Sequence, residues 1–127
     1  MGEIAIRTFC EALYCAYAPE NAFTVGPDGR IAFSAQVTED GQTTQHHVTF
    51  LKVRGLTRCP EKTVSEPWDR LELSVIEVER ESSGWRVWFN PWYLAEIEFH
   101  CDQVLLDGAE LTGDGRWLQD ELPRSAD

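Results

Sequence analysis

Residues 71–89 read LELSVIEVERESSGWRVWF, and the alternation of apolar and polar residues in this stretch decides the fold. Its apolar residues occupy odd-numbered positions as far as Val75 and even-numbered positions immediately afterwards. A parity change of one residue within a strand is what a β-bulge produces, because the extra residue turns the following side chains to the opposite face. We therefore expect a bulge near Val75–Ile76, after which the apolar side chains face the core while Glu77 and Glu79 face water.

The turn ESSG (81–84) folds this stretch into a hairpin whose register follows from its two strands. A four-residue loop makes every inward pair apolar and sets Glu79 opposite Arg86, so that one outward pair carries opposite charges. A shift by one residue would place Glu79 against Val87 and lose this match. The predicted cross-strand pairs are Arg80–Trp85, Glu79–Arg86, Val78–Val87, Glu77–Trp88 and Ile76–Phe89.

Residues 3–17, EIAIRTFCEALYCAY, predict an N-terminal helix that ends before Pro19. Apolar side chains recur there at spacings of three and four, as on one face of a helix. The members of this stripe are Ile6, Phe9, Cys10, Leu13 and Tyr17. Glu3, Arg7 and Glu11 lie off the stripe at i, i+4 spacing. Such a helix is expected to pack on a sheet.

From residue 23 the period of the sequence changes to two, which is typical of strands. We expect a short strand at Phe23–Val25, a turn at GPDG (26–29), a strand over 31–37, a hairpin turn at EDGQ (39–42) and a return strand over 43–53. Either face of this return strand, the one with Val48 and Phe50 or the one with Leu51 and Val53, could meet the core. Residues 55–67 predict a loop or an edge segment, because Pro60 and Pro67 interrupt them.

The second half continues with a strand over 94–101, in which Ile97, Phe99 and Cys101 point inward. A short strand over 104–106 follows, and Leu111 indicates another. The tail, 112–127, predicts one helical turn around Trp117–Leu122. These segments together predict a single α+β domain with a helix at 3–17 and a β-rich body at 23–111. The helix packs on a curved, mainly antiparallel β-sheet of about six strands, sandwich-like or half-barrel.

The charge of the chain limits the kinds of partner it can bind. It has 22 acidic and 11 basic residues, a formal net charge of -11. Nucleic acid is not an expected main partner, because affinity for phosphate backbones comes from Lys and Arg. A cationic protein surface is the expected complement. Four basic residues gather in one stretch, Lys52, Arg54, Arg58 and Lys62, and leave the rest more acidic.

The start of the chain lacks the pattern of a secretory signal, and no stretch approaches the ~20 apolar residues of a membrane span. No membrane partner is expected, and the cytoplasm is the expected compartment. The four cysteines, Cys10, Cys15, Cys59 and Cys101, form no CxxC and no zinc-finger spacing with a histidine. They are expected to be reduced and mostly buried.

An aromatic run, WRVWFNPWYL (85–94), supplies the first candidate contacts. Trp85, Val87 and Phe89 have inward parity, whereas Trp88 points outward. Trp92 and Tyr93 follow the break at Asn90-Pro91. One interpretation has the helix or the 55–67 loop covering Trp88. The other has Trp88, Trp92 and Tyr93 exposed together as aromatic anchors for a protein partner.

Four glutamates supply the second set, because their parity places them on the same outward face: Glu77, Glu79, Glu96 and Glu98. They could be a solvated face, an acidic patch for a partner, or a cation or acid–base site. His100 with Glu96 or Glu98 is the residue set for a metal site, although a further ligand would be needed. His46 and His47 are adjacent on a strand and point to opposite faces, so they cannot bind one metal together.

Sequence motifs for catalysis are missing. The chain contains no G-x-S-x-G, no P-loop and no GxGxxG, and GDG (113–115) lacks the strand–helix context of a phosphate cradle. Neither an enzyme, nor a cofactor, nor a bound metal is therefore expected.

In its strand texture, WDRLELSVIEVERESSGWRVWFNPWYLAEIEFHCDQVLLDG (68–108) resembles the small, acidic, β-rich bacterial proteins of toxin-immunity families and similar uncharacterised proteins. The resemblance implies a binding protein that occupies the surface of another protein. We therefore expect a non-catalytic module whose aromatic anchors and glutamate rim contact a basic protein. A small-ligand or metal site between helix and sheet is the alternative, and a homodimer through the same surface is a third possibility.

Overall fold

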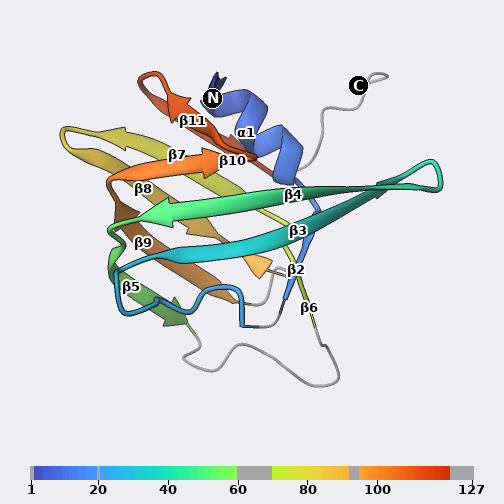
Figure 1. Ribbon diagram of the computed structural model, residues 1–127, viewed down its shortest axis with the longest axis horizontal. Helices are drawn as coiled ribbons and strands as arrows, with labels where there is room; N and C mark the ends of the chain where they lie inside the picture. The colour runs from blue at the N-terminus through green and yellow to red at the C-terminus, as the bar shows by residue number, and fades with distance from the viewer. Residues whose placement is uncertain (1, 20, 60–69, 92–94, 121–127) are drawn as a thin grey trace.

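The computed structural model describes residues 2–19, 21–59, 70–91 and 95–120 of the 127-residue chain. These residues form two β-sheets packed face to face and one short helix (Figure 1). In order across the sheet, the seven-stranded sheet contains β1 (Gly2–Ala5), β11 (Ala109–Thr112), β10 (Gln103–Leu106), β4 (Gln42–Leu51), β3 (Ile31–Glu39), β2 (Tyr17–Pro19) and β6 (Arg70–Glu72). The five-stranded sheet contains β12 (Arg116–Gln119), β7 (Ile76–Glu81), β8 (Gly84–Phe89), β9 (Glu96–Cys101) and β5 (Arg54–Cys59).

The fold is therefore mostly β, and the prediction of one sheet of about six strands with a helix packed on it is too simple. The sandwich alternative is the one that the structure adopts. Three strands that the sequence did not indicate are only three or four residues long: β1, β2 and β12. Alternation over so few residues carries no recognisable period, so these strands depend on their neighbours for pairing. Among the described ladders β1–β11 is parallel and the others are antiparallel.

The hairpin of β7 and β8 has the predicted register. All five predicted pairs, from Arg80–Trp85 to Ile76–Phe89, lie opposite each other. The turn is tighter than expected, because Glu81 and Gly84 also pair and leave only Ser82 and Ser83 between the strands.

The predicted bulge at Val75–Ile76 is wrong. Residues 73–75 instead carry the chain from β6 in the seven-stranded sheet to β7 in the five-stranded sheet. The inner faces of the two sheets look toward each other, so a chain that crosses between them must turn over to keep its apolar side inward. Leu73, Val75 and Ile76 are accordingly all buried although their parity changes.

The chain also changes sheet at other bends within the described residues. Lys52 and Val53 connect β4 to β5, and Asp102 connects β9 to β10. At these bends the backbone N–H of Val53 donates to the carbonyl of Gly29, and that of Asp102 to the carbonyl of Leu51. Together with β6–β7, these crossings tie the two layers together.

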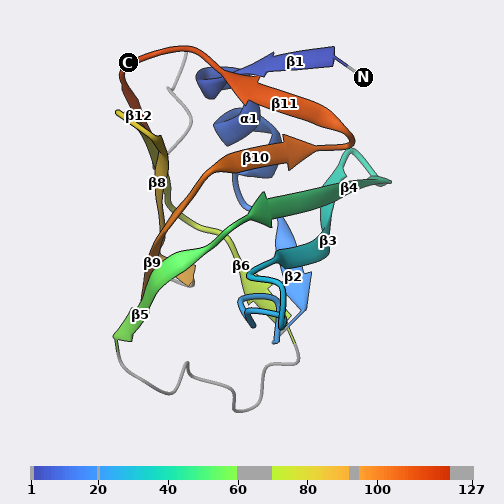
Figure 2. The same ribbon diagram turned by 60° about the vertical axis from the view of Figure 1, so that its left-hand side comes forward.

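The helix α1 (Ile6–Leu13) is shorter than predicted, and four of the five residues in its predicted stripe lie in it and are buried. Ile6, Phe9, Cys10 and Leu13 are buried. The preceding residues pair as β1 instead, and Cys15 adopts a left-handed conformation (φ 61°) before Tyr17 enters β2. Helix α1 contacts β1 and β11 of one sheet and β7 and β12 of the other. It thereby closes one end of the sandwich (Figure 2).

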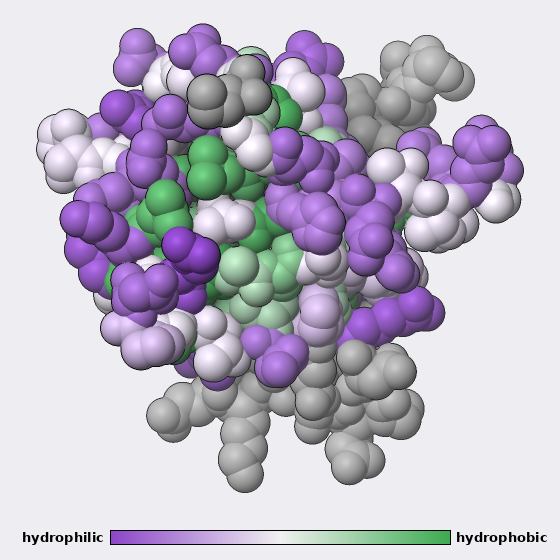
Figure 3. Space-filling model, in the orientation of Figure 1, coloured by the Kyte–Doolittle hydropathy of each residue, from purple (hydrophilic) through white to green (hydrophobic). Residues whose placement is uncertain are grey.

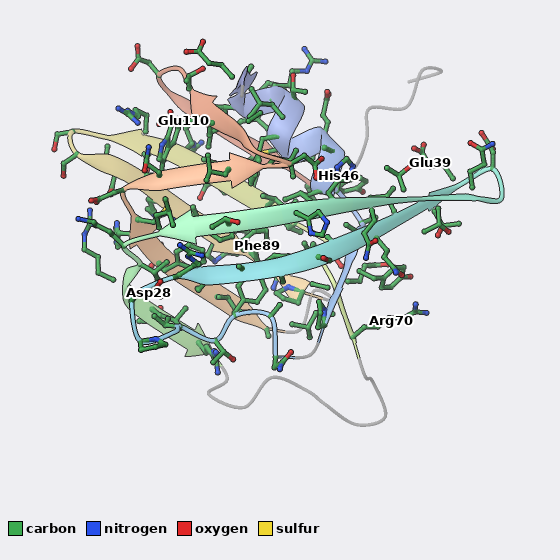
Figure 4. The ribbon with its side chains drawn as sticks, viewed as in Figure 1. Asp28, Glu39, His46, Arg70, Phe89 and Glu110 are labelled. Carbon is green, nitrogen blue, oxygen red and sulfur yellow. The ribbon has the colours of Figure 1, made fainter. Side chains whose placement is uncertain are left out.

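The core between the layers is rich in phenylalanine. Phe23 lies 5.0 Å from Phe89 and 5.2 Å from Phe33, and Phe50 lies 4.9 Å from Phe99, measured between ring centroids. Phe89 projects into this interior behind β3 and β4 (Figure 4). The predicted inward residues of the last long strand, Ile97, Phe99 and Cys101, are also buried.

Of the remaining predicted strands and turns, some are confirmed and others are wrong. The hairpin at residues 39–42 is confirmed, with Asp40 and Gly41 both at positive φ, and Val48 and Phe50 are the core face of β4. Part of the 55–67 segment is the edge strand β5, and residues 60–67 lie outside the described ranges. The strand at Phe23–Val25 is wrong, because residues 21–23 form a turn and residues 24–26 belong to no helix or strand. The helical turn predicted around Trp117–Leu122 is also wrong for residues 117–119, which pair with β7 in β12, whereas residues 121–122 lie outside the described ranges.

Candidate functional site

The outer face of the five-stranded sheet carries the predicted contact residues, and we call it the acidic face. It forms the left-hand layer in Figure 2. Alternation along β7, β8 and β9 turns their polar side chains away from the core. The acidic face thus consists of Glu77, Glu79, Glu81, Arg86, Trp88, Glu96, Glu98 and His100, with Arg116 and Leu118 from β12.

The four predicted glutamates are brought together as expected. Cross-strand pairing sets Trp88 between Glu77 on β7 and Glu98 on β9. The next row sets Arg86 between Glu79 and His100. The parity argument therefore placed these side chains on one surface correctly.

Arg86 is the centre of an ion-pair cluster. Its Nη1 lies 2.9 Å from Oε1 of Glu77, and its Nε lies 2.6 Å from Oε2 of Glu98. Glu79 is more distant, at 3.8 Å from Nη1. Burial alone would lower the pKa of Arg86, but its hydrogen bonds to Glu77 and Glu98 and their negative charges raise that pKa above the usual value. The guanidinium therefore stays charged, and its ion pairs link β8 to β7 and β9.

Both carboxylate oxygens of Glu77 form ion pairs, Oε1 with Arg86 and Oε2 with Arg116. Glu77 is only 9% exposed, and its Oε2 lies 3.1 Å from Nη1 of Arg116. A buried carboxylate needs such partners, because its desolvation cost is several kcal/mol without them. Glu77 therefore holds β12, β7 and β8 together, and its predicted contact with a partner remains a prediction.

Trp88 is half-buried on this face, and its indole Nε1–H donates to Oε1 of Glu96 at 3.1 Å. Within the part of the chain that the structure describes, the other two tryptophans each carry an arginine on the ring. Arg80 lies 4.7 Å from the Trp85 centroid, and Arg7 lies 5.1 Å from that of Trp117. No such cation or aromatic ring covers Trp88 among the described residues. Trp92 and Tyr93 lie outside those residues, and their part in the surface stays a prediction.

A pocket of about 370 Å³ opens beside Trp88. It is lined by Val75, Glu77, Trp88, Asn90, Leu118 and Asp120. Leu118 is 50% exposed, a high value for a large apolar side chain in this structure. Sequence reasoning missed Leu118 and Asp120, because it assigned them to a helical turn. Residues Arg116 to Gln119 show no apolar–polar alternation, so the sequence held no signal for this strand.

His100 does not join Glu96 or Glu98 as the metal alternative requires. Its Nδ1 lies 2.8 Å from Oε1 of Glu81. Among the residues that the structure describes, no group of three or more His, Cys, Asp or Glu side chains is arranged to hold a metal ion.

The two adjacent histidines point to opposite faces, as predicted. Nδ1 of His46 lies 2.7 Å from Oδ2 of Asp107, and Nδ1 of His47 lies 2.9 Å from Oγ of Ser34. A hydrolytic triad needs one histidine that contacts both a serine and a carboxylate. Here His46 contacts the carboxylate and His47 contacts the serine, so these residues do not form a triad.

The thiols are free in all four positions. Burial raises the pKa of Cys10 and of Cys101 to about 12. Cys59 is exposed and Cys15 is partly buried, so only half of the set is fully buried as expected.

The outer face of the seven-stranded sheet differs from the acidic face. Figure 3 shows hydrophobic residues near the middle of this face, surrounded by hydrophilic ones. Outward positions of β10, β4 and β3 there are Leu105 and Leu51, both half-buried, and Ala32, which is exposed. The two outer faces therefore offer different chemistry.

Across the described ranges, the single helix falls far short of the length and apolar character that crossing a membrane requires. No protein-family model matches this sequence, and comparison with curated proteins and with solved structures found no significant match.

Proposed function

We propose that this protein is a non-catalytic protein-binding module whose acidic face contacts a basic partner. The observation that supports the proposal is the gathering of glutamates around Trp88 on one rigid sheet surface. Five carboxylates and two arginines, Arg86 and Arg116, leave this face with a net charge of -3. The pocket beside Trp88 adds an apolar recess of the kind that receives an anchor side chain.

The physical advantage of this face is fast and selective encounter with a cationic surface. Opposite charges steer diffusion and raise association rates, and salt screens this effect over about 8–10 Å. The carboxylates of Glu79 and Glu96 reach solvent, so they can attract a cationic partner. No buried ion pair has to break for them to do so. Neutralisation of a basic protein, as in an immunity-like role, is the form of binding that we propose.

A matched pair of charge-reversal variants tests the proposal. Glu79→Lys/Glu96→Lys changes the acidic face, whereas Glu3→Lys/Glu39→Lys makes the same change of net charge on exposed positions of the other sheet. Glu39 lies at the tip of the β3–β4 hairpin (Figure 4). Affinity capture from cells that make the protein, followed by quantitative mass spectrometry, measures the recovery of each bound protein.

We expect basic proteins to be recovered by the wild type and by the control variant, but not by the acidic-face variant. Raising the salt from 50 to about 500 mM should reduce their recovery, because the screening length falls to a few ångströms. Equal recovery by both variants would contradict the proposal. Light scattering of the purified protein separates binding of a different protein from self-association through this face.

A further inference from the structure

Trp88 differs from the other described tryptophans in what lies over its ring. Arg80 and Arg7 cover the rings of Trp85 and Trp117, so this chain uses guanidinium–indole contacts repeatedly. The Trp88 ring borders the pocket instead and has no such cation among the described residues. A cation placed over an indole is attracted by the negative face of the ring.

Charge around the ring favours the same type of ligand. Glu96 is exposed, and its carboxylate is fixed at the edge of the indole by the bond from Trp88. Among the described residues, Glu96 makes no ion pair with a cation of this chain. A cationic group at the edge of the Trp88 indole would therefore meet the carboxylate of Glu96, which lies outside the pocket lining. The carboxylates that line the pocket are Asp120 and Glu77, and Glu77 is paired with Arg86 and Arg116.

The walls of the pocket suit an aliphatic stem. Val75 and Leu118 provide apolar surface beside the ring, and the volume of about 370 Å³ lies at the small end of ligand pockets. A long side chain with an apolar stem and a charged planar head matches both properties. Arginine fits better than lysine, since its planar guanidinium stacks on an aromatic ring and can pair with a carboxylate through two N–H groups.

We propose that the Trp88 pocket receives one arginine side chain of the basic partner. The stem packs on Val75 and Leu118, and the guanidinium stacks on the indole beside Glu96. This inference rests on the proposed function and makes it more specific, because it names the anchor of the partner.

Two defined peptides test the inference without knowledge of the partner. The probes are an amidated (Gly-Arg)4 peptide and its (Gly-Lys)4 counterpart, which has the same charge. Titration calorimetry at low salt gives their affinities for the wild-type protein. In parallel, ¹⁵N NMR follows the indole Nε1–H signal of Trp88, which the Trp88→Phe variant identifies by its disappearance.

We expect the arginine peptide to shift the Trp88 indole signal and to bind more tightly than the lysine peptide. Trp88→Leu should weaken its binding by about tenfold, as loss of a partly desolvated cation–π contact predicts. Glu96→Gln should weaken it by a smaller factor. Val25→Ala, at an exposed apolar position outside the acidic face, is the matched control and should bind as the wild type does.

Three results would overturn the inference: no binding of the arginine peptide at low salt, equal affinities for both peptides, or an unmoved Trp88 signal in the bound state. The NMR arm uses the wild-type protein, so it gives an answer even if Trp88→Leu does not fold. The proposed function would fail separately, through equal capture of basic proteins by the two charge-reversal variants. If Glu79→Lys/Glu96→Lys abolishes binding of a partner but Trp88→Leu still binds it, the arginine pocket is refuted while the proposed function stands.

Discussion

Gly84 is the residue on which the β7–β8 turn depends. Its φ is +126°, and a Cβ at this position would lie 2.2 Å from the carbonyl oxygen of Cys101 on the neighbouring strand. Both the backbone conformation and the space exclude a side chain. The turn ESSG was recognised in the sequence, but the close approach of β9 could not be, since it depends on a strand that follows later in the chain.

Replacing Gly84 by alanine should therefore be much more costly than an ordinary glycine substitution. We expect Gly84→Ala to lower the free energy of unfolding by about 3 kcal/mol or more, through backbone strain and overpacking. Gly108→Ala is the control, because its φ is +85° and no atom lies within 4 Å of the new Cβ. It should cost about 1 kcal/mol. Urea unfolding followed by tryptophan fluorescence measures both, and equal losses would refute this account of the turn.

Asp107 links the β10–β11 turn to β4. Its Oδ2 lies 2.7 Å from Nδ1 of His46, and its Oδ1 accepts the backbone N–H of His47 at 2.7 Å. Partial burial alone would raise the pKa of Asp107, but these two hydrogen bonds bring it below the ordinary value. A carboxyl whose pKa is lowered by folding stabilises the protein above its unfolded pKa. That stabilisation is lost as the pH falls through the folded value.

We expect Asp107→Asn to destabilise the protein by up to about 1 kcal/mol at pH 7, because the pair is half-exposed. Asparagine tolerates the positive φ of 52° at this position, so the turn itself should persist. The difference in melting temperature between wild type and variant should shrink as the pH falls below about 4, and it should vanish once Asp107 is protonated in the folded state. A difference that stays constant from pH 7 to pH 2 would show that the ionised carboxylate is not responsible.

At the scale of the elements, Arg86 joins three strands through their outward side chains. Its side chain is 25% exposed and that of Glu77 11%, so these charges are much better shielded from solvent than an ordinary surface pair. Removing one partner of a buried pair leaves the other charge unpaired, which costs more than the pair contributed.

Arg86→Leu should consequently lower the free energy of unfolding by about 2–3 kcal/mol, below the figure for fully buried pairs because solvent reaches the cluster. Arg86→Lys should lower the free energy of unfolding by roughly half as much. Lysine keeps the positive charge, but a single ammonium group cannot reach Glu77 and Glu98 as two separate guanidinium nitrogens do. Arg30→Leu, which breaks an exposed pair with Asp28, is the control and should change stability by less than about 0.5 kcal/mol. Urea denaturation measures the free energy of unfolding of the three variants. If Arg86→Leu loses no more of it than the control does, the ion pairs of Arg86 do not stabilise the sheet as described.

Strand pairing that is local in sequence could be predicted, whereas pairing between distant segments could not. The β7–β8 register followed from alternation and from the Glu79–Arg86 pair, and the same alternation placed the four glutamates on one face. The parity change at Val75 was read wrongly, because a bulge and a crossing between sheets leave the same pattern in one sequence. The pocket was missed for a related reason. Leu118 reaches Glu77 only because β12 pairs with a strand some forty residues earlier.

At the scale of the whole molecule, the two sheets and the helix share one core. Cys10 on α1 and Cys101 on β9 both belong to it, and burial raises the pKa of each thiol to about 12. At pH 8 the reactive thiolate is therefore almost absent at both positions in the folded state. Cys59, on the edge strand β5, is exposed.

Thiol labelling should report this shared core. In native buffer at pH 8, we expect Cys59 to react with an aromatic disulfide reagent within minutes. Cys10 and Cys101 should react only through unfolding, at the same rate and with the same urea dependence. Peptide mapping by mass spectrometry assigns each rate without any substitution. Faster labelling of Cys10 than of Cys101 would show that the helix detaches separately from the sheets.

The parallel pairing of β1 with β11 has a consequence for how the chain is made. Gly2 pairs with Ala109, so β1 acquires its neighbour only after the segment between them has been synthesised. Until then α1 lacks part of the surface on which it rests, and the nascent chain carries an open sheet edge. Contacts so distant in sequence make folding slow and leave that edge open to aggregation. Strand β1 and helix α1 can therefore complete their packing only once β11 has been synthesised, and until then the nascent chain needs protection from aggregation.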